Sequence, residues 1–352
     1  MNLLDLARPE IRALAPYASA RALADSAGIL LNANENPYPP PGDSGQDLNR
    51  YPDPQPAALK SRLAALYGID ADQLLLTRGS DEGIDLLMRA FVRAGQDRVL
   101  TCPPCFGMYA LSARIQGGEV IEVPLIETES DWQLDVEGIQ AAPACRLYFL
   151  CSPNNPTGNR IPTSQVLDLA ERVSGHGLVI IDEAYIEFSA DESLAGQVGS
   201  VPNLVVLRTL SKAYALAGCR LGAVIGSAEL IGLLRRIIAP YPLPTPSIQA
   251  ALQALDAPND QRHQLEELDR QKQRLVLVLK DHPAIERIWP GAANFILVRT
   301  RPGSALVSAA ADAGIRLRDQ SAQPGLNDCV RITVGRPEET DHLIQFLRSW
   351  SP

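Results

Sequence analysis

The segment NLVVLRTLSKAYALAGCRLGAVIG, residues 203–226, holds a lysine between two short apolar runs. Each run has the length of a buried β-strand. Lys212 is followed by small residues such as Ala213 and Gly218, and then by Arg220. A lysine that only solubilises a surface helix has charged neighbours, whereas this one has small ones. The pattern indicates that the backbone and Lys212 come close to another chemical group.

Apolar runs alternate with helical patterns on the N-terminal side of this segment. Together with the two runs above, the predicted strands are 73–79, 97–102, 119–125, 146–152, 177–184, 203–211 and 221–227. The predicted helices are 56–68, 80–95, 106–118 and 163–175. Such alternation is typical of a mostly parallel sheet with helices on both faces. The sequence therefore predicts an α/β fold with a doubly wound sheet.

The pattern changes after the proline-rich stretch PYPLPTPS, residues 240–247. A long polar helix over 258–282, short strands, and helices near 304–313 and from 337 predict a smaller α+β domain. At the other end, the first fifty residues are rich in turn residues and have little core of their own. We expect this arm to lie across the body of the protein or a partner subunit. The predicted division is an arm with part of the small domain (1–45), a large domain (46–255) and a small domain (256–352).

Composition excludes several classes of protein. The chain has 352 residues and a formal net charge of −9, which argues against a nucleic-acid partner. No apolar stretch is long enough to predict a membrane span, and the N-terminus lacks the pattern of a signal peptide. The six cysteines do not form a disulfide framework, which is typical of reduced thiols in the cytoplasm. A cytoplasmic localisation is expected.

One cysteine pair, Cys102-Pro103-Pro104-Cys105, has the spacing of half a zinc site or of a redox motif. No second pair of this kind is present, and no histidine lies at ligand spacing from it. A structural turn is the better interpretation, and no metal is expected.

Polar side chains follow the predicted strands, at the edge of the sheet where ligands bind in open α/β folds. Their types match the needs of pyridoxal phosphate, which bonds to a lysine amine and needs a carboxylate at its ring nitrogen. Lys212 and Asp182 can supply these two groups, while Asn155 and Tyr185 can donate to the ring oxygen. The remaining candidates are Arg220, Thr209, Ser211, Ser80 and Asp81 for the phosphate and Phe106 for the ring face. The run IIDEA also occurs in P-loop ATPases, but the P-loop itself is absent.

These motifs together resemble the fold-type I pyridoxal-phosphate aminotransferases nearly from end to end. The resemblance rests on SPNNPTG (152–158), IIDEAY (180–185), TLSKAYALAGCRLG (209–222) and RITVG (331–335). Finer features resemble the histidinol-phosphate aminotransferases within that family: PYASAR (16–21), LNANENP (31–37), NRYPDP (49–54), RGSDEGIDLL (78–87), CPPCFGMY (102–109) and LRDQ (317–320). Phe106 stands where the family often has tyrosine, and Cys105 stands where a small residue is common.

The resemblance implies a transaminase of histidine biosynthesis, which moves an amino group between L-histidinol phosphate and 2-oxoglutarate. It also implies a homodimer with shared active sites, in which Tyr51 reaches the cofactor phosphate of the neighbouring subunit. Lys212, Asp182 and Tyr185 are the expected catalytic residues. Both substrates are anions, which guanidinium groups bind well. Arg331, Arg318 and Tyr17 are the expected substrate-binding residues.

Three other interpretations are open from the sequence. A threonine-phosphate decarboxylase and an aminotransferase for aromatic amino acids would share the cofactor residues. A non-catalytic regulator that binds the cofactor is disfavoured, because no basic patch or DNA-binding segment precedes the body. The segment Asn34-Glu35-Asn36 could line the substrate cleft or could form a turn.

Overall fold

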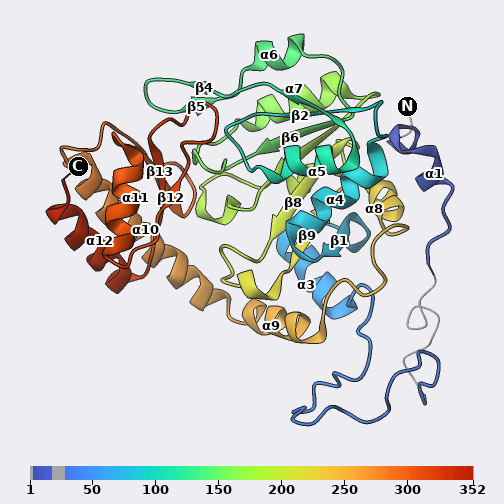
Figure 1. Cartoon of the computed structure of the whole chain (residues 1–352). Coiled ribbons are helices and arrows are strands. Elements are labelled where there is room, and N and C mark those ends of the chain that lie inside the picture. Colours follow the sequence, from blue (N-terminus) through green and yellow to red (C-terminus); the bar gives the residue numbers. More distant parts are fainter. Residues whose placement is uncertain (1–2, 18–27, 352) are drawn as a thin grey trace.

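The computed structural model describes residues 3–17 and 28–351 and contains two main sheets (Figure 1). Within these residues the larger sheet has seven strands in the order β1-β9-β8-β7-β6-β2-β3. The strands are β1 (Leu74–Thr77), β2 (Arg98–Thr101), β3 (Glu119–Glu122), β6 (Leu147–Cys151), β7 (Leu178–Asp182), β8 (Leu204–Thr209) and β9 (Gly222–Ile225).

Among the described strands of the large sheet, β9 is antiparallel to both of its neighbours, β1 and β8. The other strand pairs are parallel. Thr209 pairs with Gly222 across the β8–β9 ladder, so the chain turns back within a short connection. The connection therefore stays at the edge of the sheet and keeps Lys212 and Arg220 together there.

Helices cover both faces of the large sheet, which confirms the predicted doubly wound α/β fold (Figure 1). One face packs against α4 (Gly79–Phe91), α5 (Met108–Gln116) and α8 (Ala228–Leu234). The other face packs against α3 (Ala57–Tyr67), α6 (Val136–Ala141), α7 (Thr163–Val173) and α9 (Thr245–Leu255). The connections add the short helices η2 (Ala71–Gln73), η3 (Ile186–Phe188), η4 (Leu194–Gln197) and η5 (Ala217–Cys219).

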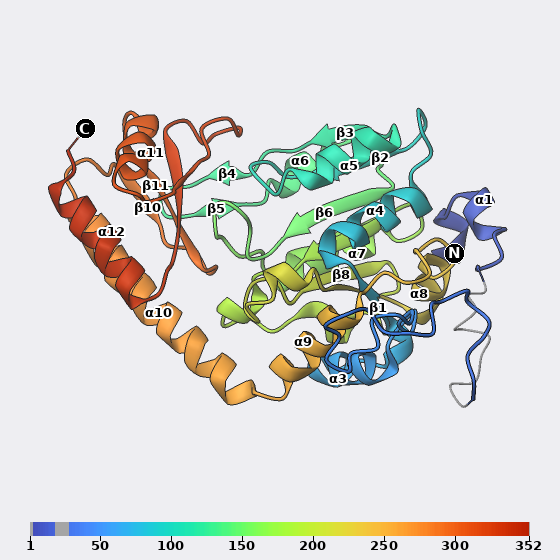
Figure 2. The ribbon, with the colours of Figure 1, turned by 60° about the horizontal axis from the view of Figure 1, so that its bottom comes forward.

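The small domain begins with the long helix α10 (Pro258–Lys280), which crosses from α9 to the second sheet (Figure 2). Its sheet, in the order β10-β11-β13-β12, is antiparallel throughout the described residues. The strands and remaining helices are β10 (Arg287–Trp289), β11 (Phe295–Arg299), α11 (Gly303–Asp312), β12 (Arg318–Asp319), β13 (Cys329–Thr333) and α12 (Pro337–Ser349). We propose that the domain boundaries lie near residues 45 and 255, as the sequence predicts.

A hairpin of the large domain reaches the small sheet. It consists of β4 (Ile126–Glu127) and β5 (Trp132–Gln133). The Glu127 carboxylate accepts hydrogen bonds from Arg287 at 2.7 Å and from Arg299 at 2.9 and 3.0 Å. Both guanidinium groups lie 5.0 Å from the ring centroid of Trp289. These contacts join the two domains at a point remote in sequence from α10.

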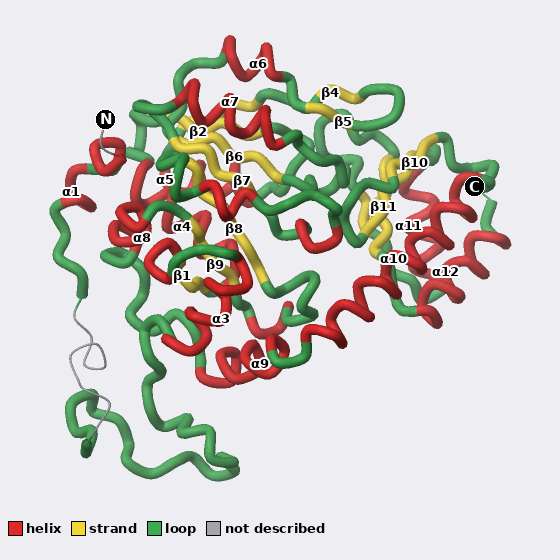
Figure 3. The backbone as a smooth tube through the Cα atoms, turned by 180° about the vertical axis from the view of Figure 1, so that it is seen from behind, coloured by secondary structure: helices red, strands yellow, loops and turns green. Residues whose placement is uncertain are grey.

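The described part of the arm includes η1 (Leu3–Leu6) and α1 (Pro9–Arg12), whose buried residues pack on the large domain. From residue 28 to α3 the chain forms a loop that extends away from the large sheet (Figure 3). Glu35 holds this loop together, because its carboxylate accepts hydrogen bonds from Arg50 Nη1 at 2.9 Å and from the Tyr51 backbone N–H at 2.7 Å. Asn36 and Asn34 form turns in the same loop, with Asn34 at a φ of 56°.

Most predicted elements are present, and the differences have physical causes. Helix α9 begins within PYPLPTPS, where the sequence predicts only a break, because a proline fits the first turn of a helix without losing a backbone hydrogen bond. The predicted strand 119–125 ends at Glu122, and β12 is only two residues long. Within the described residues, no helix is both long and apolar enough to cross a bilayer.

Candidate active site

A cavity of about 840 Å³ lies at the carboxyl ends of the parallel strands, between the large sheet and the small domain. Every predicted site residue except Tyr17 and Tyr51 lines it. These residues are Ser80, Asp81, Phe106, Asn155, Asp182, Tyr185, Thr209, Ser211, Lys212, Arg220, Arg318 and Arg331. Cys105, Cys151 and Gln320 line it as well. The fold thus gathers groups from both domains around one space.

Asp182 is the last residue of β7, and only 2% of its surface is exposed. Its carboxylate accepts a hydrogen bond from the Tyr109 hydroxyl at 2.7 Å and another from the Ala184 backbone N–H at 3.0 Å. Burial nevertheless raises the pKa of Asp182 to about 6, since the charged form loses its water. A cationic group in the cavity would stabilise this carboxylate.

Tyr109 was not among the predicted site residues. It is fully buried on α5, and its ring stacks on Phe149 at 4.9 Å between centroids. Burial raises the pKa of Tyr109, so its hydroxyl keeps the proton that it donates to Asp182. In the sequence it is the last residue of the motif CPPCFGMY (102–109), which gives no indication that its hydroxyl contacts Asp182.

Lys212 lies in the turn after β8, and its amine is accessible through the cavity. Its Nζ lies 5.6 Å from the ring centroid of Tyr185. The cavity walls desolvate the amine, and Arg331 and Arg220 repel its charge, so the pKa of Lys212 is lowered. A lysine with a lowered pKa offers a neutral, nucleophilic amine at a lower pH than a surface lysine does.

Arg220 anchors the side of the cavity next to the start of α4. It has a φ of 51° and donates to the Asp81 carboxylate at 3.0 Å and to the Ser211 hydroxyl at 3.4 Å. A Cβ at Gly79 would lie 2.6 Å from the Arg220 guanidinium, and a Cβ at Gly222 would lie 2.4 Å from the Gly79 backbone. Both glycines are therefore required for this close approach. The Arg220 guanidinium therefore lies beside the N-terminus of α4, a position that favours negative charge.

A second polar group joins the two domains. Asn155, in the turn after β6, accepts a hydrogen bond from Arg331 Nη1 and donates to the Tyr185 hydroxyl at 3.4 Å. Arg331 pairs in register with Arg318 across β12 and β13, so two guanidinium groups enter the cavity side by side. Burial lowers the pKa of Arg331. An anion bound in the cavity would therefore stabilise the charged form of Arg331.

Phe106 and Cys105 line the cavity, and Cys102 lies outside its lining. The Phe106 ring meets the Tyr109 ring edge-on, with 5.6 Å between centroids. Burial raises the pKa of Cys105 to about 12 and raises that of Cys102 as well, so both thiols stay protonated. Protonated thiols are poor nucleophiles and poor metal ligands. Their environment agrees with a structural turn.

The two remaining predicted residues lie outside the cavity of their own chain. Tyr17 is 74% exposed, and Tyr51 is 49% exposed and stacks on Tyr241 at 4.4 Å between centroids. Residues 18–21 of the motif PYASAR lie outside the described residues. Contributions of Tyr17 and Tyr51 to an active site stay predictions.

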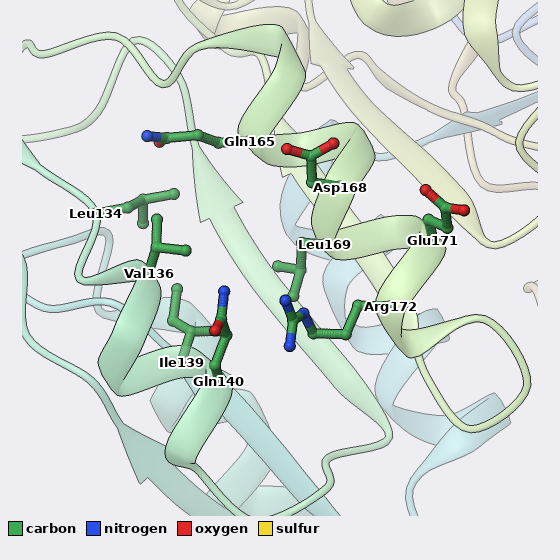
Figure 4. Close-up of a pocket in the computed structure, with 9 residues that line it drawn as sticks. All are labelled: Leu134, Val136, Ile139, Gln140, Gln165, Asp168, Leu169, Glu171 and Arg172. Atoms are coloured by element: carbon green, nitrogen blue, oxygen red, sulfur yellow. The ribbon is translucent and has the colours of Figure 1, made fainter.

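A second hollow, of about 470 Å³, lies between α6 and α7 (Figure 4). Leu134, Val136, Ile139 and Leu169 form its apolar part. Its charged residues, Asp168, Glu171 and Arg172, are all exposed on α7. None of the residues that line this hollow is a lysine or a buried ionisable group.

Comparisons with known proteins agree with this geometry. The model of the family "Aminotransferase class I and II" matches residues 26–347. The histidinol-phosphate aminotransferase of Xylella fastidiosa (strain 9a5c) is 46% identical, over 99% of this chain and 96% of that protein. The enzyme of the same name from Shigella sonnei is 43% identical, over 99% of this chain and 98% of that one.

Among solved structures, histidinol-phosphate aminotransferase from Sinorhizobium meliloti in complex with pyridoxal-5'-phosphate superposes with a TM-score of 0.79. The two are 26% identical, and the match covers 87% of this chain and 85% of that one. The sequence-based prediction of a fold-type I aminotransferase is thereby confirmed. The chain belongs to the class I and II aminotransferases, a pyridoxal-phosphate-dependent family.

Proposed function

We propose that the protein is a histidinol-phosphate aminotransferase. It interconverts L-histidinol phosphate and 2-oxoglutarate with imidazole-acetol phosphate and L-glutamate. Full-length relatives of that name at 43–46% identity support this specificity. The structural observation that carries it is the pair Arg318 and Arg331, which enters the same cavity as the Lys212 amine. A phosphate monoester and a dicarboxylate both present an oxyanion that a guanidinium can bind with two hydrogen bonds.

Pyridoxal phosphate fits the residues of the cavity. The buried carboxylate of Asp182 suits a protonated ring nitrogen, since its two hydrogen bonds leave its charge without a cationic partner in contact. Because Gly79 and Gly222 pack closely together, the Arg220 guanidinium lies beside the start of α4. A phosphate bound there would contact Arg220, Thr209 and Ser211. When bound, the cofactor supplies a cationic conjugated ring that accepts an electron pair from the substrate carbon.

The residues of the chain then have distinct tasks. With the cofactor bound, the Lys212 amine would hold its aldehyde carbon and would move the proton at the reacting carbon of the substrate. Asp182 would hold the ring nitrogen, and the hydrogen bonds from Tyr109 and Ala184 favour its ionised form. Asn155 and Tyr185 would donate to the ring oxygen, and Phe106 would pack on the ring. Arg331, with Arg318, fixes the substrate anion and so the orientation of the substrate amine.

The active form is a homodimer with shared sites. The loop from residue 28 onward exposes large apolar side chains, including Ile29 at 90%, Leu31 at 86% and Tyr38 at 77%. A second copy of the chain would cover them, and Tyr51 lies in the same loop, from which it would reach the partner's cofactor phosphate. The enzyme acts in the cytoplasm, in keeping with six cysteines that are all unpaired.

A half-reaction tests the function. The holoenzyme is mixed with L-histidinol phosphate without 2-oxoglutarate, and the absorbance of the lysine-bound cofactor is followed. We expect rapid conversion to the pyridoxamine form, and return of the original spectrum on addition of 2-oxoglutarate. Threonine phosphate and phenylalanine serve as alternative substrates. Release of carbon dioxide from threonine phosphate, or conversion by phenylalanine alone, would refute the proposed specificity.

A further inference from the structure

The large and small domains touch backbone to backbone beside the active-site cavity. Gly158, at the end of the turn that contains Asn155, lies against Gly291 of the loop before β11. A Cβ at Gly291 would lie 2.6 Å from Gly158 Cα, and a Cβ at Gly158 would lie 2.9 Å from Gly291 Cα. The Ala292 backbone N–H donates to the Gly158 carbonyl at 2.7 Å. We call residues 154–158 and 291–293 together the interdomain joint.

Lys272 holds one side of the joint. It extends from α10, and its Nζ donates to the Gly291 carbonyl at 2.8 Å and to the Ala293 carbonyl at 2.7 Å. These carbonyls flank the residue whose N–H crosses to the other domain. Among the described residues, no carboxylate lies within ion-pair distance of Lys272, so its hydrogens are directed to this loop. The ammonium fixes the direction in which the Ala292 N–H points.

The joint continues directly into the residues that face the substrate. On one side, Asn155 accepts from Arg331 and contacts the Tyr185 hydroxyl. On the other side, the loop leads into Phe295, whose ring lies 5.4 Å from the Arg331 guanidinium and 5.3 Å from the Tyr185 ring. Because Asn155 and Phe295 both contact Arg331, a shift of the interdomain joint would displace the Arg331 guanidinium.

We propose that Lys272 is a positioning residue for the reaction: by holding residues 291 and 293 it fixes Arg331 relative to the cofactor and so sets the affinity for substrate anions. This inference rests on the proposed function of the same cavity. Lys272 touches neither substrate nor cofactor residues, and an error of about 1 Å at Arg331 is enough to weaken a two-pronged anion contact.

The test compares Lys272→Met with Lys280→Met, a matched control that removes an exposed lysine from the same helix. In the holoenzyme we expect Lys272→Met to raise KM for both histidinol phosphate and 2-oxoglutarate about tenfold, with kcat and the cofactor absorbance nearly unchanged. Lys272→Arg keeps hydrogen-bond donors but places them differently, so it should recover part of the lost substrate affinity. Lys280→Met should behave as the wild type.

Two measurements do not depend on turnover. The dissociation constant of glutarate, a dicarboxylate that cannot react, should rise about tenfold in Lys272→Met holoenzyme. Amide hydrogen exchange of the peptide around Ala292 should become faster in the same variant. A lower Tm with unchanged KM and unchanged glutarate binding would show that Lys272 is only structural and would overturn the inference. Absence of turnover in the wild type, with the glutarate difference intact, would instead refute the proposed function.

Gly291→Ala provides a second lesion in the same joint, in case Lys272→Met does not fold. The added methyl group would collide with the Gly158 backbone. In addition, Gly291 has a φ of 57°, a backbone conformation that residues with a side chain rarely adopt. It should separate the two loops and weaken glutarate binding in the same way. Glutarate affinity equal to the wild type in a folded Gly291→Ala enzyme would contradict the role of the joint.

Discussion

Replacing Tyr109 by phenylalanine removes one of the two hydrogen bonds on Asp182 without changing the packing of the ring. A hydrogen bond to a charged group is worth about 1.5–3 kcal/mol, and each pKa unit corresponds to about 1.4 kcal/mol. The loss should therefore raise the pKa of Asp182 from about 6 to roughly 7–8. The pKa of Asp182 rises in the variant because the Tyr109 hydroxyl donates to the carboxylate and so favours its charged form.

The assay is the rebinding of pyridoxal phosphate to the apoenzyme as a function of pH. If only the ionised Asp182 carboxylate binds the protonated ring, the affinity for pyridoxal phosphate falls as the pH drops below the pKa of Asp182. At pH 7 the Tyr109→Phe variant should then bind roughly two- to tenfold more weakly than the wild type, and at pH 9 equally well. Titration of the cofactor's own phosphate is common to both proteins and cancels in the ratio.

Tyr148→Phe is the control, because it removes a hydroxyl from another buried tyrosine, where it contacts Cys145 and His176. Its pH profile should match the wild type. The reasoning is refuted if Tyr109→Phe keeps the wild-type profile, or if both variants shift it equally.

Three further outcomes follow from the site. Lys212→Ala should fold and bind the cofactor non-covalently but lose transamination, and turnover at even a tenth of the wild-type rate would exclude Lys212 as the essential amine. Arg331→Ala should lower kcat/KM for both half-reactions by more than tenfold, since leaving a buried anion unpaired costs about 2–5 kcal/mol, and Arg331→Lys should restore only part, which steady-state kinetics with each substrate would show. Mixing Lys212→Ala with Tyr51→Ala subunits should recover activity, because one site of the hybrid dimer carries neither change; heterodimers without activity would contradict shared sites.

The cofactor side of the cavity was predictable because its residues follow strands directly. Asp182 ends β7, and Lys212 and Arg220 lie on the β8–β9 connection, so the strand pattern alone brings them to one edge. The antiparallel direction of β9 was not predictable in this way, since the connection over residues 210–221 is as long as the shortest crossovers between parallel strands.

The supporting residues could not be predicted in the same way. Tyr109 lies on an amphipathic helix, where a buried tyrosine and a buried phenylalanine give the same pattern, and its partner Asp182 is 73 positions away. Lys272 belongs to a long polar helix in which every lysine has the pattern of a solvated residue. Its partners are backbone carbonyls, which leave no signature in the side-chain sequence. Only the folded chain shows that these donors have specific acceptors.

The bridge from Glu127 to Arg287 and Arg299 bears on whether the small domain is an autonomous folding unit. Its sheet depends on a carboxylate from the other domain to neutralise two guanidinium groups that flank Trp289. In an isolated fragment of residues 256–352 these two charges would repel each other, and the indole would lose its contact with Trp132. The domains should therefore melt in a single cooperative transition, and Glu127→Gln should split that transition into two by releasing residues 256–352 first.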